Sequence, residues 1–169
     1  MMLVINMFYI NTFLFHSIIG HLLESVAYSK IDGGILYGYW TPVYGIGAIL
    51  IVLINYFICT KVKKKLVRPL ILFIACALIL GLFELCSGII IEELFGRIFW
   101  NYSDEMFSIF KYASLKMMII WGICGVLFIY VINPFMQLII KKIPKSISLT
   151  LAFLFLLDLI YTLLTISKL

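Results

Sequence analysis

The sequence predicts an all-α membrane protein, a polytopic bundle of five transmembrane helices with its N-terminus inside the cell and its C-terminus outside. Of the 169 residues, 64% are hydrophobic and only 12% are charged, whereas a soluble domain is about half apolar and a quarter charged. A globule of this size has too little interior to bury so much apolar surface. We therefore expect a single integral membrane domain over residues 1–169, embedded as a multi-pass protein in the lipid of the cell membrane.

Five segments have the length of about twenty mostly apolar residues that a spanning helix needs. They are Leu3–Tyr28, Pro42–Cys59, Leu70–Leu94, Ala113–Ile140 and Ile147–Ile166. Pro42 suits the first turn of the second helix, where the missing N–H has no helical partner. Pro134 lies inside the fourth segment and is expected to kink or break it. The first segment lacks a basic start and a small-residue cleavage site, so we expect a retained helix rather than a signal peptide.

Positive charge is concentrated in two alternate loops, which predicts the orientation. The loop KVKKKLVR joins the second and third segments, and KKIPK joins the fourth and fifth. The remaining loops hold only Lys30, Arg97 and Lys111. Because cytoplasmic loops carry the excess of Lys and Arg, we place both basic loops inside. This pattern accounts for the net charge of +5 without nucleic-acid binding, for which no soluble basic face exists.

Several ionisable residues lie inside the predicted spans, where they are costly, rare and usually functional. In the first span, Ser17, Gly20, His21 and Glu24 recur at three and four residues and so share one helix face. In the third span, Glu84, Gly88 and Glu92 are four residues apart and so share one helix face. The candidates for substrate binding or ion coupling are Glu24, Glu84, Glu92, His21, Lys116 and Asp158.

Each candidate also has a purely structural interpretation. Glu92 can be solvated at its helix end, Lys116 can extend to the interface, and Glu24 can pair with Lys116. Glu84, near the midplane, is either protonated or partnered by Lys116 or a bound cation. His21 and Glu24 have the i, i+3 spacing of two metal ligands, but one such pair leaves metal and cofactor unassigned. A nucleotide-binding motif is absent from the sequence.

The two outer loops interleave aromatic and polar residues. Aromatic rings with polar tips favour the headgroup zone of a membrane. We therefore expect both loops to be ordered and to cover the polar site from outside. The cap candidates are Gly34, Tyr37, Trp40, Trp100, Tyr102 and Ser103.

A set of residues in the first four segments and in the loops that follow them matches a family pattern in order and spacing. The positions are Phe15, Ser17, Gly20, Glu24, Gly34, Leu36, Gly38, Pro42, Tyr44, Gly45, Gly47, Glu84, Glu92, Phe95, Trp100, Tyr102, Ser103, Trp121-Gly122, Asn133-Pro134-Phe135 and Ile143-Pro144. Over about residues 13 to 145 they resemble the ABC-transporter type IV family of bacterial membrane proteins, also called CmpB-like. The family pattern that this sequence resembles includes the motif F-x-S-x-x-G-W-x-x-E, a glycine-rich loop and a W-D-Y-S motif. Its tryptophan is His21 here, and a family arginine ahead of the fourth helix is absent, with Lys111 and Lys116 the nearest cations.

The resemblance implies a component of a transport system. Our leading hypothesis is therefore a permease-like membrane component with an outward-facing polar site lined by intramembrane carboxylates. Because five helices make a thin wall, a separate ATPase or a homo-oligomer is the expected partner. A second hypothesis, an enzyme acting on a lipid or prenyl headgroup, rests on His21, Glu24 and Glu92 beside the interfacial aromatics. A third is a non-catalytic accessory or scaffold subunit whose charges are merely paired. We favour a protein without enzymatic activity.

Overall fold

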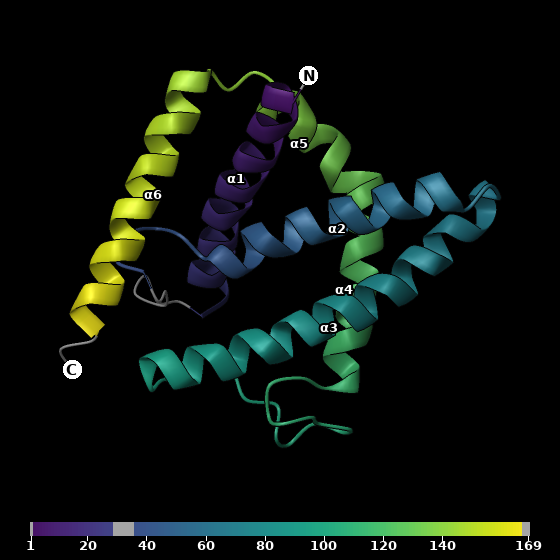
Figure 1. Ribbon diagram of the computed structural model, residues 1–169. Coiled ribbons are helices and arrows are strands. Elements are labelled where there is room, and N and C mark those ends of the chain that lie inside the picture. Colours follow the sequence, from purple (N-terminus) through teal and green to yellow (C-terminus); the bar gives the residue numbers. More distant parts are fainter. Residues whose placement is uncertain (1, 29–35, 167–169) are drawn as a thin grey trace. The chain divides into compact units, whose positions relative to one another are not determined.

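The computed structural model describes residues 2–28 and 36–166, and this part of the chain is helical and contains no β-strand (Figure 1). The all-α class predicted from the sequence is therefore confirmed. The elements are α1 (Met2–Tyr28), α2 (Pro42–Lys61), the short helix η1 (Lys65–Val67), α3 (Arg68–Phe95), α4 (Leu115–Leu127), η2 (Phe128–Ile132), α5 (Asn133–Ile140) and α6 (Lys145–Ile166).

Four helical stretches in the described ranges are long and apolar enough to cross a membrane. They are Pro42–Lys61, Lys65–Phe95, Leu115–Ile140 and Lys145–Thr165. Large apolar side chains on these stretches are exposed, such as Phe153 and Leu164 on α6, each at 61%. Such surface is stable only against lipid or another protein, so the chain is a membrane protein. The first helix, α1, has 27 residues, a spanning length, but it carries Asn11, His16 and Glu24 within that length.

The two prolines highlighted by the sequence have different effects. Pro42 is the first residue of α2, as predicted. Pro134 does not end its helix, because the preceding residues Phe128–Ile132 form a π-helical turn in which Asn133 N–H donates to the Phe128 carbonyl. A proline has no N–H and its ring crowds the carbonyl four residues back, and the wider turn accommodates both effects. The predicted fourth helix is thus α4, η2 and α5 in succession.

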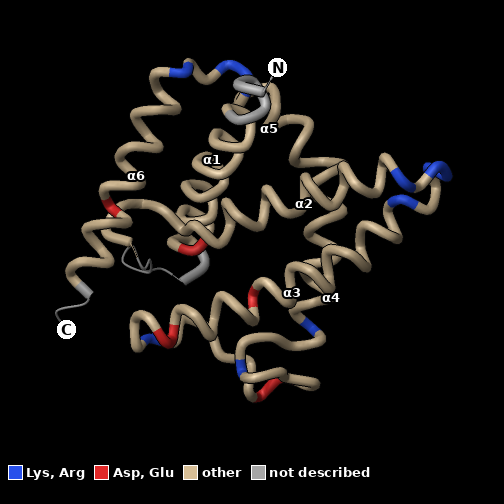
Figure 2. Tube along the Cα trace, viewed as in Figure 1, with Lys and Arg blue, Asp and Glu red and all other residues tan. Residues whose placement is uncertain are grey.

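The chain forms two compact units. The first comprises Met1–Ile49 and Phe135–Leu169, and the second comprises Leu50–Pro134. Basic residues gather at one turn of each unit, between α2 and α3 and between α5 and α6 (Figure 2). In the second unit, Arg68 closes the α2–α3 turn by donating from Nε to the Val62 carbonyl at 3.0 Å.

In the first unit, α1 packs against α6 and against the start of α2. The ring of Phe13 on α1 meets Phe155 on α6 edge-on, with centroids 5.0 Å apart. Gly45 faces Phe13 and Ser17 so closely that a Cβ there would lie 2.6 Å from the Phe13 carbonyl oxygen. The Thr41 amide donates to the Ser17 carbonyl at 3.0 Å. These contacts seat the loop before α2 on the polar face of α1.

In the second unit, α3 packs against α4 through glycines. A Cβ at Gly122 would lie 2.9 Å from the Phe73 carbonyl oxygen, and one at Gly125 would lie 2.7 Å from the Cys76 Cβ. Small residues let helix backbones approach closely, which is the main means of helix association in lipid. This close crossing brings the α4 residue Trp121 within reach of α3.

The glycine contact predicts opposite effects for two alanine substitutions. Gly122→Ala should lower the unfolding free energy by about 1–3 kcal/mol, because the backbone carbonyl it meets cannot move aside. Gly47→Ala, whose Cβ would meet nothing within 4 Å, should be neutral or stabilising by up to about 1 kcal/mol. Unfolding in mixed detergent micelles measures both, and equal effects would contradict the packing described.

Candidate functional site

Glu84 lies within the apolar stretch Lys65–Phe95 and is held by two donors. Its side chain is only 6% exposed. Tyr102, from the loop after α3, donates its hydroxyl to one carboxylate oxygen at 2.9 Å. Trp121, on α4, donates its indole N–H to the other oxygen at 2.8 Å. Because a buried carboxylate is stable only when its oxygens are paired, these two bonds fix the loop and α4 on one point of α3.

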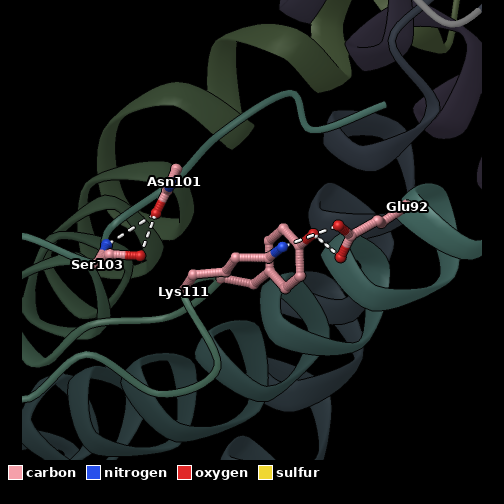
Figure 3. Close-up of polar contacts among 5 residues, drawn as sticks. Glu92, Asn101, Ser103 and Lys111 are labelled. Atoms are coloured by element: carbon pink, nitrogen blue, oxygen red, sulfur yellow. Dashed lines mark hydrogen bonds and ion pairs between the residues drawn. The ribbon is translucent and has the colours of Figure 1, made fainter. Parts of the chain in front are cut away.

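Glu92, two turns further along α3, anchors the same loop at its other end. Lys111 donates from Nζ to one carboxylate oxygen at 2.8 Å, and the Tyr112 hydroxyl donates to the other (Figure 3). The Tyr112 ring lies against Gly88, where a Cβ would come within 2.5 Å of it. Glu84, Gly88 and Glu92 therefore form one face of α3 that is covered by residues of the loop.

The loop that covers this face, residues 96–114, has an unusual backbone. Gly96 ends α3 in the left-handed conformation that glycine adopts freely (φ 62°), but Phe107, Phe110 and Lys111 also have positive φ, at 55°, 47° and 59°. Such conformations are unfavourable for residues with a Cβ and persist only where the surroundings impose them. At Lys111, the backbone is held by a hydrogen bond in which the Lys111 carbonyl accepts from the Tyr102 amide at 2.7 Å.

Two ionisable groups of this loop have shifted pKa values. The pKa of Lys111 is raised above its usual value, chiefly because Glu92 accepts a hydrogen bond from the ammonium. The pKa of Tyr112 is raised mainly by desolvation, with a further contribution from the bond to Glu92. Both shifts favour the protonated forms that donate to Glu92, so the contact is fully formed at neutral pH.

The other loop residues form local contacts. Asn101 accepts at its side-chain oxygen from the Ser103 amide at 2.9 Å and from the Ser103 hydroxyl at 2.6 Å (Figure 3). Trp100 donates its indole N–H to the Tyr112 carbonyl at 3.2 Å. Ser103 thus shapes a turn, and Trp100 ties the two limbs of the loop together.

Lys116 pairs with a residue that the sequence did not single out. Its ammonium lies 2.6 Å from a Glu105 carboxylate oxygen. The other Glu105 oxygen accepts from the Ser114 hydroxyl at 3.4 Å, and Ser114 in turn caps α4 by accepting from the Met117 amide at 3.2 Å. The donors on Glu84 are neutral side chains, not this lysine.

Asp158, on α6, holds the backbone of the loop that precedes α2. Its oxygens accept from the Gly38 amide at 2.8 Å and the Tyr37 amide at 3.2 Å. The Trp40 ring meets Phe155 edge-on at a centroid distance of 5.7 Å. A Cβ at Gly38 would lie 2.8 Å from an Asp158 oxygen, so glycine allows the carboxylate to reach the chain. Gly34, a further cap candidate, lies outside the described residues.

Glu24 and His21 lie beside the start of α2. The Thr41 hydroxyl donates to a Glu24 carboxylate oxygen at 3.2 Å, and Tyr44 and His21 also interact with this carboxylate. The His21 ring is 5% exposed and meets the Tyr39 ring edge-on at 5.3 Å. In the described ranges, no group of three or more His, Cys, Asp or Glu side chains is arranged to hold a metal ion.

The predicted candidates therefore fall into two sets. Within the second unit, Glu84 and Glu92 share one covered face, together with Trp100 and Tyr102. Within the first unit, His21 and Glu24 form one group, while Asp158 with Tyr37 and Trp40 forms another. Sequence reasoning did not include Trp121, Tyr112 and Glu105 among the candidates. A tryptophan N–H inside an apolar stretch needs an acceptor, and that requirement was the available signal for Trp121.

Apolar spanning helices with a buried, hydrogen-bonded carboxylate define a helical membrane protein of the kind found among transport components. The family model described as "Putative ABC-transporter type IV" matches residues 11–164. The chain belongs to this family, as the motifs in its sequence indicated. No curated protein and no solved structure matches it.

The two donors on Glu84 yield a stability prediction. Tyr102→Phe should lower the unfolding free energy by about 1–3 kcal/mol, because it leaves a buried carboxylate oxygen without its partner. Tyr130→Phe is the matched control, since Tyr130 is 49% exposed, and it should change stability by less than about 0.5 kcal/mol. Chemical unfolding of the purified protein in detergent compares them, and a Tyr102 effect no larger than the control would contradict the buried bond.

The loop contact with Glu92 predicts loss of stability at alkaline pH. The Lys111 pKa is raised above its ordinary value of 10.5, so the stabilisation is present below pH 10.5 and is lost as the pH rises through the raised pKa. Tyr112 acts in the same direction, because its pKa is also raised. Thermal unfolding between neutral and strongly alkaline pH should show a steeper fall for the wild type than for Lys111→Met. Parallel curves would contradict the contact.

Proposed function

We propose that this chain is the permease-like membrane component of a transport system in the cell membrane. In this proposal residues 1–169 form a single integral membrane domain with five spans, α1 being the first. The basic turns at Lys61–Arg68 and Lys141–Lys145 face the cytoplasm, so the N-terminus lies inside and the C-terminus outside. Family membership and the four apolar helices support a location in a membrane.

The single observation that carries the proposal is the environment of Glu84. A carboxylate in an apolar helix costs free energy, and proteins place one there mainly on substrate or ion pathways. Its two donors, Tyr102 and Trp121, are neutral, so within the part of the chain that the structure describes no cation is bonded to the carboxylate. A cationic substrate group or a coupling ion would satisfy that charge. Glu84 is thus the proposed binding residue, and the loop of residues 96–114 is its outer cover.

Glu92 and Lys111 act in this proposal as the latch of the cover. Their ion pair is partly exposed, with side chains 37% and 32% accessible, so water and salt reach it and the pair can open. Opening would move Tyr102 away from Glu84, because the Tyr102 amide is bonded to the Lys111 carbonyl. Access to Glu84 from the outer side would then depend on the latch.

A separate ATPase is the proposed energy source. The sequence has no phosphate-binding loop of its own, and its family is named for ABC transporters. A second copy of the chain is the other proposed partner, because a few helices cannot surround a pathway alone. Both proposals can be examined by crosslinking in native membranes, where a chain found only as a monomer would contradict them.

The accessory-subunit hypothesis has its own support. Glu92, Lys116 and Asp158 all have protein partners that fix loops or a helix end. Buried or interfacial charges paired in this way stabilise an architecture without taking part in transport. Glu84 distinguishes the two functions, since its donors satisfy its hydrogen bonds without neutralising it.

Transport predicts a large effect of one neutral substitution. Cells that produce the Glu84→Gln chain with its native partners should take up radiolabelled amino-acid or sugar mixtures at least about tenfold more slowly than cells with the wild type. A tenfold loss corresponds to the free energy of about one charge-assisted hydrogen bond. Glu93→Gln, an exposed acid on the same helix, is the control and should leave uptake unchanged. Normal amounts of folded Glu84→Gln protein with undiminished uptake would overturn the proposal.

A further inference from the structure

A second polar site lies in the first unit, on the face of α1 that meets the start of α2. Ser17 is 0% exposed and His21 is 5% exposed. Among residues 2–28 and 36–166, the Ser17 hydroxyl and both ring nitrogens of His21 have no hydrogen-bond partner. These positions are four residues apart, so the two side chains lie on one face of the helix.

Unpartnered polar atoms at this depth indicate a missing ligand. Buried side-chain polar groups in proteins almost always have a partner, and those that lack a protein partner are usually bonded to ordered water or an ion. A neutral imidazole needs an acceptor for its N–H and a donor for its other nitrogen. Water supplies both, and the Ser17 hydroxyl can donate to or accept from the same molecules.

Glu24 lies at the more exposed end of this polar face. This carboxylate is on the same face, one turn beyond His21, and is only half-buried. It accepts from the Thr41 hydroxyl at 3.2 Å. Two other titratable side chains contact this face. The Tyr39 ring meets the His21 imidazole, and Tyr44 interacts with Glu24. From α6, Asp158 is bonded to the loop amides of Tyr37 and Gly38.

We propose that His21 is a buried proton-binding site, hydrated by internal water, that exchanges protons with the membrane surface through Glu24. A proton taken up by the Glu24 carboxylate passes through water to the unprotonated ring nitrogen of His21, forming an imidazolium and restoring the carboxylate. Release follows the same path in reverse, so no other reactant is consumed.

This inference is independent of the Glu84 site, because every contact that carries it lies in the first unit. It assigns to α1 a function that the transport proposal does not require, the reversible binding of a proton. Histidine suits this role because it changes charge near neutral pH.

Solid-state NMR of the full chain in lipid vesicles, with nitrogen-15 in histidine, tests the proposal directly. The sequence contains two histidines, and loss of signals in His21→Gln assigns them. His16 is an internal reference, since its Nδ1 donates to the Thr12 carbonyl at 2.7 Å. We expect the His21 nitrogens to receive magnetisation from water and to exchange a proton with it. A dry ring in one tautomer throughout would overturn the proposal.

Two substitutions test the proton exchange through Glu24 and the hydration. Glu24→Gln should slow proton exchange at His21 at least about tenfold, while Glu93→Gln should leave it unchanged; equal rates in both would contradict exchange through Glu24. Ser17→Ala removes a water ligand, so the melting temperature should fall, whereas a dry site would be relieved of an unpaired hydroxyl and melt higher. Ser148→Ala is the control, because that hydroxyl, also buried, already donates to the Pro144 carbonyl at 3.3 Å.

Discussion

The structure of the second unit depends on how the Glu84 carboxylate is satisfied. An unpaired carboxylate inside an apolar helix would make the fold unfavourable, and the two neutral donors come from segments far apart in the sequence, Tyr102 in the loop and Trp121 on α4. The glycines of α4 complete the arrangement, since only a close crossing brings the indole to α3. One carboxylate thereby determines where a loop and a helix lie.

The strained loop is understandable from the same constraint. Phe107, Phe110 and Lys111 hold unfavourable positive φ angles, and the hydrogen bonds that compensate lie at its two ends, on Glu84 and Glu92. The loop is therefore held in a strained conformation by hydrogen bonds at both ends. In the proposed function, this strain and the partly exposed ion pair would allow the loop to open over Glu84.

How much of the structure the sequence could predict depends on whether a feature is set by neighbouring residues or by residues far apart in the chain. Apolar length and composition predicted the helical class, and local proline chemistry predicted the start of α2. The spacing of Glu84 and Glu92 predicted their shared face. Partners across the loop were not predictable in the same way, because Lys116 had several acids within reach and only the loop conformation selects Glu105. Likewise, the sequence predicted that Pro134 would kink or break the helix, but not the π-helical turn that precedes it, since a helix can widen locally around a proline.

The closure of the loop over the acidic face of α3 can be measured most directly by disulfide trapping in native membranes. A Cβ at Gly88 would lie 2.8 Å from the Tyr112 Cβ. A disulfide needs about 3.5–4.5 Å, so an outward shift of about 1 Å by the closed loop would let the bond form. With the native cysteines replaced, Gly88→Cys combined with Tyr112→Cys should crosslink rapidly, whereas Gly88→Cys with Met106→Cys, at an exposed loop position, should not. Equal crosslinking of both pairs, or none in the first, would contradict a closed cover.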